Sequence, residues 1–116
     1  MLLDCDFHIH SRYSQATSKN MTLENISVQA PRKGLHLMGT GDALHPAWLS
    51  DIEKLKEFSE GIYEKNNFKF IITTEVEDAR RVHHLIFLPS VSAAKGLSES
   101  LKKHSKDLAA DGRPKL

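Results

Sequence analysis

The sequence predicts an α/β fold with a largely parallel sheet, and three observations support this prediction. Apolar segments with strand periodicity alternate along the 116 residues with segments of helical periodicity, in the order strand, helix, strand, helix, strand, strand, helix. Parallel neighbours in a sheet need such crossover helices. The polar residues that stand out lie at or near the C-terminal ends of predicted strands, where α/β folds collect their chemistry: His8, His10, Asp42 and Glu75.

Composition limits the classes of protein that the chain can represent. Its 16 Lys+Arg nearly balance 15 Asp+Glu, so no broad basic surface indicates nucleic-acid binding. The single cysteine, Cys5, cannot form an internal disulfide, which favours a reducing cytoplasmic setting. No apolar stretch approaches the roughly 20 residues that span a bilayer. We therefore expect one domain or part of one, residues 1–116, in the cytoplasm and away from membranes.

The first predicted strand covers residues 1–9. Apolar residues alternate with polar ones over this segment, so Asp6, His8 and His10 share one face. Two imidazoles two residues apart on a strand leave the same face and can bind the same metal ion. The alternative is a polar face turned to solvent, which is the more common explanation of an isolated His-x-His pair.

A helix and a second strand follow. Thr22 is a suitable N-cap for a helix that ends between residues 31 and 34, with Glu24 in its first turn. Residues 35–40 then read as a buried strand, followed by Asp42 after two closely spaced glycines that allow close backbone approach to a ligand. Asp42 and His45 are equally compatible with a helix cap and a loop residue.

Residues 46–65 are predicted to form one amphipathic helix. Their apolar residues recur at steps of three and four among Glu and Lys, which indicates a helix with one buried face. Trp48 lies on this face and is therefore expected in the core. The apolar residues are Trp48, Leu49, Ile52, Leu55, Phe58 and Ile62.

Two further strands, residues 68–73 and 82–88, precede a last helix over residues 91–104. Glu75 follows a very apolar strand, where a bound cation would keep its carboxylate ionised. The alternative places Glu75 in a surface turn among other charged residues. His83 and His84 must point to opposite faces of their strand, so at most one of them joins a metal cluster.

Several separated segments resemble the motifs of the PHP superfamily, the polymerase and histidinol phosphatase superfamily. Residues 6–11 with Tyr13-Ser14 are similar to its first motif, DxHxHS, and residues 39–42 with His45-Pro46 resemble its second. Thr74-Glu75 and Val82-His83 look like its glutamate and a later histidine. The similarity is greatest to endonuclease Q-like members, and it spans almost the whole chain through residues 16–19, 39–48, 73–76, 82–90 and 112–114.

The resemblance implies a distorted (β/α)7 barrel, of which residues 1–116 would be the N-terminal portion. It implies two or three divalent ions, zinc or manganese with magnesium as an alternative, and hydrolysis of phosphoesters. His8, His10 and Glu75 would hold the first ion, and Glu75 would bridge to a second ion on His83, which aligns better than His84. Asp42 is carried over as a further ligand, and Asp42 and Glu75 as catalytic residues.

The implied substrate of the endonuclease Q-like members is DNA, cut on the 5′ side of deaminated or missing bases in repair. The chain departs from the superfamily pattern at Gln15, Ala16 and Ala43, where many members carry histidines. A later histidine and a closing Asp-x-His do not follow His104. We therefore expect the chain alone to be inactive and to associate with the missing half of the barrel or with itself.

Other functions remain open at this point. The chain could be a metal-binding remnant or split subunit without activity of its own, or a PHP phosphatase acting on small phosphoesters. A third alternative is an α/β interaction module whose histidines are incidental. The presence or absence of bound metal separates the last alternative from the others.

Overall fold

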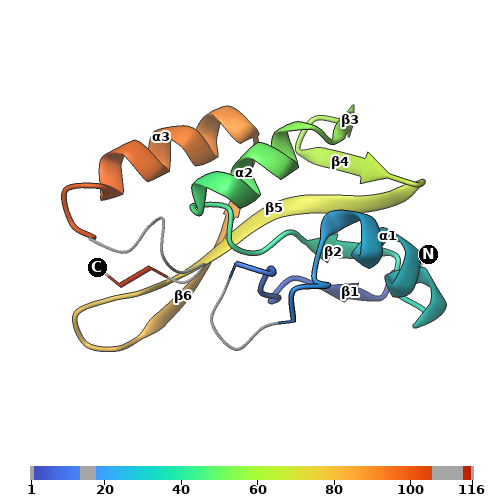
Figure 1. Ribbon diagram of the computed structural model, residues 1–116, viewed down its shortest axis with the longest axis horizontal. Coiled ribbons are helices and arrows are strands. Elements are labelled where there is room, and N and C mark those ends of the chain that lie inside the picture. Colours follow the sequence, from blue (N-terminus) through green and yellow to red (C-terminus); the bar gives the residue numbers. More distant parts are fainter. Residues whose placement is uncertain (1, 14–17, 106–113, 116) are drawn as a thin grey trace.

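The structure, a computed structural model, describes residues 2–13, 18–105 and 114–115. Positions 14–17, 112 and 113, which carry part of the resemblance and two of the departures, lie outside the described residues. Figure 1 shows the elements: β1 (Cys5–Asp6), α1 (Leu23–Arg32), β2 (Leu37–Gly39), α2 (Pro46–Glu53), β3 (Lys56–Ser59), β4 (Ile62–Lys65), β5 (Phe68–Glu77), β6 (His83–Leu88) and α3 (Val91–Leu101).

The sheet is mixed, with strand order β1-β2-β5-β4-β3. β1, β2 and β5 run parallel, whereas β4 pairs antiparallel with β5, and β3 pairs antiparallel with β4. β6 forms a second antiparallel ladder along the C-terminal part of β5, from Ile72 to Glu77. The predicted α/β class is confirmed, but the expectation of a largely parallel sheet is wrong because two hairpins bring antiparallel strands to β5.

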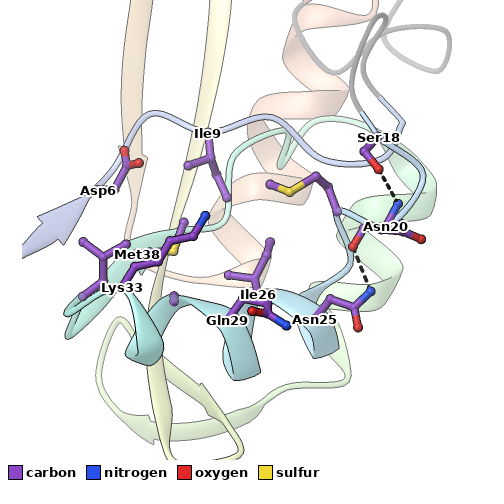
Figure 2. Close-up of a pocket in the computed structure, with 12 residues that line it drawn as sticks. Asp6, Ile9, Ser18, Asn20, Asn25, Ile26, Gln29, Lys33 and Met38 are labelled. Carbon is purple, nitrogen blue, oxygen red and sulfur yellow. Dashed lines mark hydrogen bonds between the residues drawn. The ribbon is translucent and has the colours of Figure 1, made fainter.

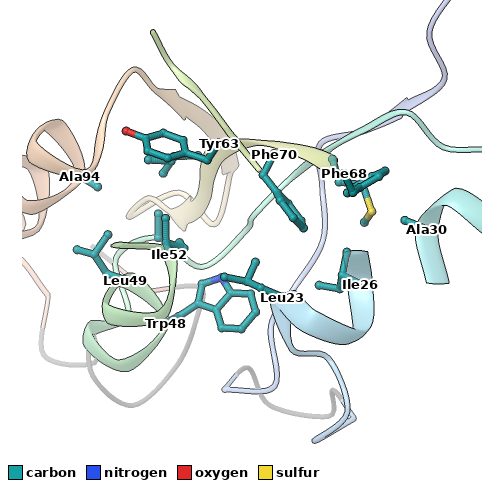
Figure 3. Packing of buried hydrophobic residues seen from close by; sticks show 13 residues of the cluster. Leu23, Ile26, Ala30, Trp48, Leu49, Ile52, Tyr63, Phe68, Phe70 and Ala94 are labelled. Atoms are coloured by element: carbon teal, nitrogen blue, oxygen red, sulfur yellow. The ribbon is translucent and has the colours of Figure 1, made fainter. Parts of the chain in front are cut away.

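The hydrophobic core lies on one face of β5. Phe68, Phe70 and Ile72 alternate along this strand and point toward the helices, as the period of two requires. Figure 3 shows Phe68 and Phe70 meeting side chains of α1 and α2, with Tyr63 of β4 and Ala94 of α3 at one side. The members of this cluster are Leu23, Ile26, Ala30, Met38, Ala43, Trp48, Leu49, Ile52, Tyr63, Phe68, Phe70, Ile72 and Ala94.

The other face of β5 carries a different set of residues. Lys69, Thr73, Glu75 and Glu77 alternate with the core residues and therefore leave the sheet on the side opposite the helices. The structure thus separates a packed face from a polar face, and the candidate site lies on the polar one.

The predicted helix over residues 46–65 is wrong in its second half. Helix α2 ends at Glu53, and β3 and β4 form a hairpin in which Gly61 adopts a positive φ of 79°. Trp48, Leu49 and Ile52 are buried as expected, but Phe58 on β3 is 57% exposed. The later apolar residues fit a helical spacing by coincidence. They lie on strands, because β4 pairs with β5 and β3 pairs with β4.

Other predicted boundaries also shift. Within the described part of the first predicted strand, the paired segment β1 is short and covers Cys5–Asp6. The strand predicted to end at Thr73 continues to Glu77 because β6 pairs with it. The predicted N-cap is confirmed, since the Thr22 side chain accepts a hydrogen bond from the Asn25 N–H. In the described part of the chain, no helix has the length and apolarity that a membrane crossing requires.

Candidate metal centre

His8, His10 and Glu75 come together on the polar face of the sheet. Each offers one ligand atom, and these three atoms lie within 4.8 Å of one another. His8 Nε2 contacts Glu75 Oε2, and His10 Nε2 lies 4.0 Å from the same oxygen. Residues from two distant parts of the sequence therefore converge at one point, where the ends of parallel strands meet.

Strand β5 places Glu75 in this cluster. The residue lies inside the β5–β6 ladder, opposite Leu85, and its side chain is only 4% exposed. It is therefore a buried carboxylate rather than a member of a surface turn. The His8 side chain is 55% exposed and leaves the cluster open toward solvent.

The His8-Ile9-His10 segment lies beyond β1 and packs closely on the chain that follows β2. A side chain at Gly41 would collide with the Ile9 carbonyl oxygen, and Gly41 has a positive φ of 63°. Only glycine satisfies both conditions without strain. The two closely spaced glycines noted in the sequence thus allow close packing against the segment after β1.

Asp42 lies behind His10. One carboxylate oxygen is 3.3 Å from His10 Nδ1, and the other accepts a short hydrogen bond from the Ser11 N–H. Because a carboxylate only accepts, the proton of His10 belongs on Nδ1, which leaves Nε2 as the nitrogen that faces Glu75. Such histidine–carboxylate pairs commonly orient metal-binding imidazoles. Asp42 is not among the three clustered residues.

His83 and His84 point to different carboxylates. His83 Nδ1 lies 3.3 Å from Glu75 Oε1, and its Nε2 lies 2.9 Å from Glu77 Oε1. His84 Nε2 instead lies 2.9 Å from Asp78 Oδ2. The structure therefore brings His83 next to the cluster and places His84 at the turn between β5 and β6. The contact from Glu77 was missed in the sequence, although its spacing of two from Glu75 on one strand indicates a shared face.

His45 has a structural position. It is the N-cap of α2, where its Nδ1 accepts a hydrogen bond from the Ala47 N–H, and its ring stacks on Tyr13 with centroids 4.6 Å apart. Trp48 is fully buried, and its Nε1 donates to the Thr40 carbonyl. Of the two residues for which helix capping was an open alternative, His45 is the cap.

A cavity with a volume of about 550 Å³ lies apart from the His8, His10 and Glu75 cluster. Figure 2 shows it between the β1 end of the chain and α1, with Ile9 entering from above and Ile26 and Met38 below. Asn25, Gln29 and Lys33 stand at its rim. Its lining contains none of the histidines or Glu75, so the chemistry of the site comes from the cluster and not from this cavity.

The donor set of the cluster fits a divalent transition-metal ion. Two imidazole nitrogens and one carboxylate oxygen are ligands that zinc commonly takes in proteins, and manganese accepts the same atoms. The proximity of the three ligand atoms and the burial of Glu75 support this reading. Further ligands would be needed to complete a four-coordinate or six-coordinate shell.

The chain is similar in sequence and in structure to known proteins. No protein-family model matches the chain. An uncharacterized protein of Methanocaldococcus jannaschii is 47% identical over all 116 residues, which make up 14% of its length. The crystal structure of a lesion-specific endonuclease from Pyrococcus furiosus, PfuEndoQ, matches the whole chain with a TM-score of 0.94 and 46% identity. Endonuclease Q in complex with a 27-mer duplex substrate carrying an abasic lesion matches with a TM-score of 0.93 and 46% identity.

These matches confirm the resemblance to endonuclease Q that the motifs predicted. The chain covers 29% and 30% of the two endonuclease chains, so it corresponds to a part of them. Within this shared fold, two histidines and a glutamate lie together in one cluster.

Proposed function

We propose that this chain is the metal-binding portion of an endonuclease Q-like hydrolase, a member of the PHP superfamily that cuts DNA at deaminated or abasic positions in the cytoplasm. The observation that carries this proposal is the His8, His10 and Glu75 cluster, within a chain whose 116 residues all match part of a lesion-specific endonuclease. The DNA substrate is inferred from the abasic duplex bound by the related endonuclease.

Each of the clustered residues would have its own role at this site. His8, His10 and Glu75 hold the first ion, and His83 with Glu75 takes part in a second. A divalent ion here supplies Lewis acidity toward a phosphoester oxygen. Asp42 keeps His10 in the tautomer and orientation that present Nε2 to the site, which is a different role from the direct ligand or catalytic residue expected from the sequence.

Residues 1–116 would form part of one barrel domain, and the rest of the ligand set would come from other parts of the complete protein. A site that lacks part of its own ligand set binds its ions less tightly and catalyses less efficiently than the complete site. We therefore expect the 116-residue chain by itself to bind metal weakly and to cleave no DNA at a measurable rate.

A chimeric enzyme tests the proposed function. The 116 residues replace the matching 29% of the Pyrococcus furiosus endonuclease, and cleavage is assayed on a duplex with one abasic site in the presence of manganese. We expect cleavage at the lesion, because the cluster would then have its remaining ligands. His8→Ala with His10→Ala in the chimera should abolish cleavage, whereas His104→Ala, on an exposed residue beyond α3, should leave it unchanged.

The chimera can also disprove the proposal. A chimera that folds, binds metal and still leaves the abasic duplex intact would show that this sequence is not a nuclease segment. If the His104→Ala substitution by itself abolished cleavage, the assay would report the stability of the chimera and not the metal centre.

A further inference from the structure

We propose that the buried hydroxyl of Thr73 positions the His8-Ile9-His10 segment for metal binding. The proposal rests on the proposed function, since it concerns the same metal centre. The histidine segment lies beyond the last β1 residue that pairs with β2, Asp6, so strand pairing does not fix its place. Contacts to neighbouring strands must do so.

Thr73 makes the contact that ties this segment to β5. Its Oγ1 donates to the Phe7 carbonyl oxygen at 3.2 Å and accepts from the Gly41 N–H at 2.9 Å. A hydroxyl has one proton to donate, and here that proton goes to the residue directly before His8. One fully buried side chain thus joins the segment after β1, the segment after β2 and the strand that carries Glu75.

Hydrogen bonds to residues 40 and 43 fix the backbone of Thr73, which belongs to β5. Its N–H donates to Thr40 Oγ1 at 3.2 Å, and its carbonyl accepts from the Ala43 N–H at 3.2 Å. Thr73 precedes Glu75 by two residues on the same face of the strand. The hydroxyl therefore sets the distance between the histidines and the glutamate.

The side chain of Phe7 makes a packing contact as well. Its ring packs edge-on against the ring of Phe87, with centroids 5.4 Å apart, and Phe87 is the cross-strand partner of Thr73. A side chain at Gly39 would meet both the Thr73 side chain and the Phe7 carbonyl oxygen. Within this packing, the Thr73 hydroxyl makes polar contacts. Its removal leaves the Phe7 carbonyl oxygen and the Gly41 N–H without this hydrogen-bond partner.

Metal affinity is sensitive to such support. Ligand atoms must lie within about 0.2 Å of their preferred distances, and loss of a group that orients a ligand typically lowers affinity 10- to 100-fold. We therefore expect Thr73→Val, which keeps the shape and removes the hydroxyl, to weaken zinc binding by the 116-residue chain about 10-fold or more. Thr73→Ser restores the hydroxyl and should restore affinity to near the wild-type value.

The control is Ile52→Val, which removes one methyl group from the core away from the histidine segment. It should lower the thermal midpoint of the metal-free chain by an amount similar to Thr73→Val while leaving zinc affinity unchanged. Unchanged affinity in Thr73→Val would overturn the proposal. Affinity in Thr73→Ser as weak as in Thr73→Val would also overturn it, because the methyl group and not the hydroxyl would then matter.

A second readout needs no metal. In the metal-free chain, the ring nitrogen signals of His8 and His10 should shift in Thr73→Val and stay close to wild type in Thr73→Ser, with His104 as the internal reference. If neither wild type nor Thr73→Ser binds zinc, the metal centre and the proposed function fail. Ring signals of His8 and His10 that are identical in wild type and Thr73→Val would refute the positioning role by itself.

Discussion

At the scale of single residues, Asp42 is a buried carboxylate that lies beside His10 without belonging to the His8, His10 and Glu75 cluster. It receives hydrogen bonds from the His10 side and from the Ser11 N–H, and it adopts a left-handed backbone conformation with φ of 50°, which aspartate tolerates better than most residues. Its position was predicted from the sequence, but its orientation was not, because that depends on which oxygen meets which donor across 31 or 32 residues of chain.

Replacing Asp42 tests this orienting role. Asp42→Asn removes the charge and one acceptor, so His10 loses the partner that fixes its tautomer. We expect zinc affinity, measured by competition with a chromophoric chelator, to fall about 10- to 100-fold. Asp51→Asn on α2 is the control and should leave the affinity as in wild type. An Asp42→Asn variant with wild-type affinity would remove Asp42 from the site.

His83 and His84 are adjacent in sequence and differ in surroundings. His83 lies between Glu75 and Glu77, whereas His84 contacts Asp78. We expect His83→Asn to lower the amount of manganese bound per chain at saturation and His84→Asn to leave it unchanged, because only the former removes an imidazole beside Glu75. Elemental analysis after dialysis measures both. Equal losses in the two variants would contradict the assignment.

At the scale of secondary-structure elements, the sequence predicted those whose signals are local. Thr22 capped its helix as expected, and the strand predicted over residues 68–73 forms the first part of β5. The β3–β4 hairpin was missed because its residues also fit a helical spacing, and only pairing with β5 decides between the two. Thr73 was missed as well, since a hydroxyl within an apolar strand carries no signal for the partner that it meets 66 residues away.

The turn between β5 and β6 depends on Asp78. Its carboxylate contacts His84 Nε2 and accepts from the N–H groups of Arg80 and Val82. The hydrogen bond from His84, followed by that from Val82, lowers the pKa of Asp78 below its ordinary value of 3.8. A folded-state pKa below the unfolded one adds stability that is complete above the unfolded value and is lost as the pH falls through the folded value.

The stability of an Asp78→Asn variant should follow this pH dependence. At pH 7 we expect its urea midpoint to lie below that of wild type, because the ionised carboxylate is a better acceptor. Well below the ordinary pKa of the carboxyl, the two midpoints should converge, since wild type then also carries a neutral group. Glu60→Gln, in the turn of the β3–β4 hairpin, serves as the control. A constant gap at all pH values would contradict the assigned pKa shift.

At the scale of the whole molecule, the helices cover one face of the sheet and leave apolar side chains exposed elsewhere. Phe87 of β6 is 54% exposed beside Phe7, and Phe58 of β3 is 57% exposed over the Lys69 ammonium group. Lys69 shares the polar face of β5 with Glu75, and Phe87 is the cross-strand partner of Thr73, which lies on that same face. These rings therefore border the face that carries the His8, His10 and Glu75 cluster. Exposed apolar surface of this kind favours association with another chain.

Self-association is therefore expected for the isolated chain. In sedimentation experiments the average mass should rise with concentration, and Phe58→Glu should lower it by adding a charge to the edge strand. Val28→Glu on α1 is the matched control, because it changes an exposed apolar residue on the helical layer. Equal behaviour of the two variants would show that the sheet side does not drive association.

The central claim is that His8, His10 and Glu75 form a metal centre within this chain, and metal content tests it most directly. The purified 116-residue chain is equilibrated with zinc, dialysed and analysed for bound metal, in parallel with the double variant His8→Ala, His10→Ala and with His104→Ala. Because weakly bound zinc leaves the chain in zinc-free buffer, the dialysis is run to equilibrium against a fixed zinc concentration. The account predicts bound zinc in wild type and in His104→Ala, and none in the double variant. Zinc retained by the double variant at the wild-type stoichiometry would contradict it.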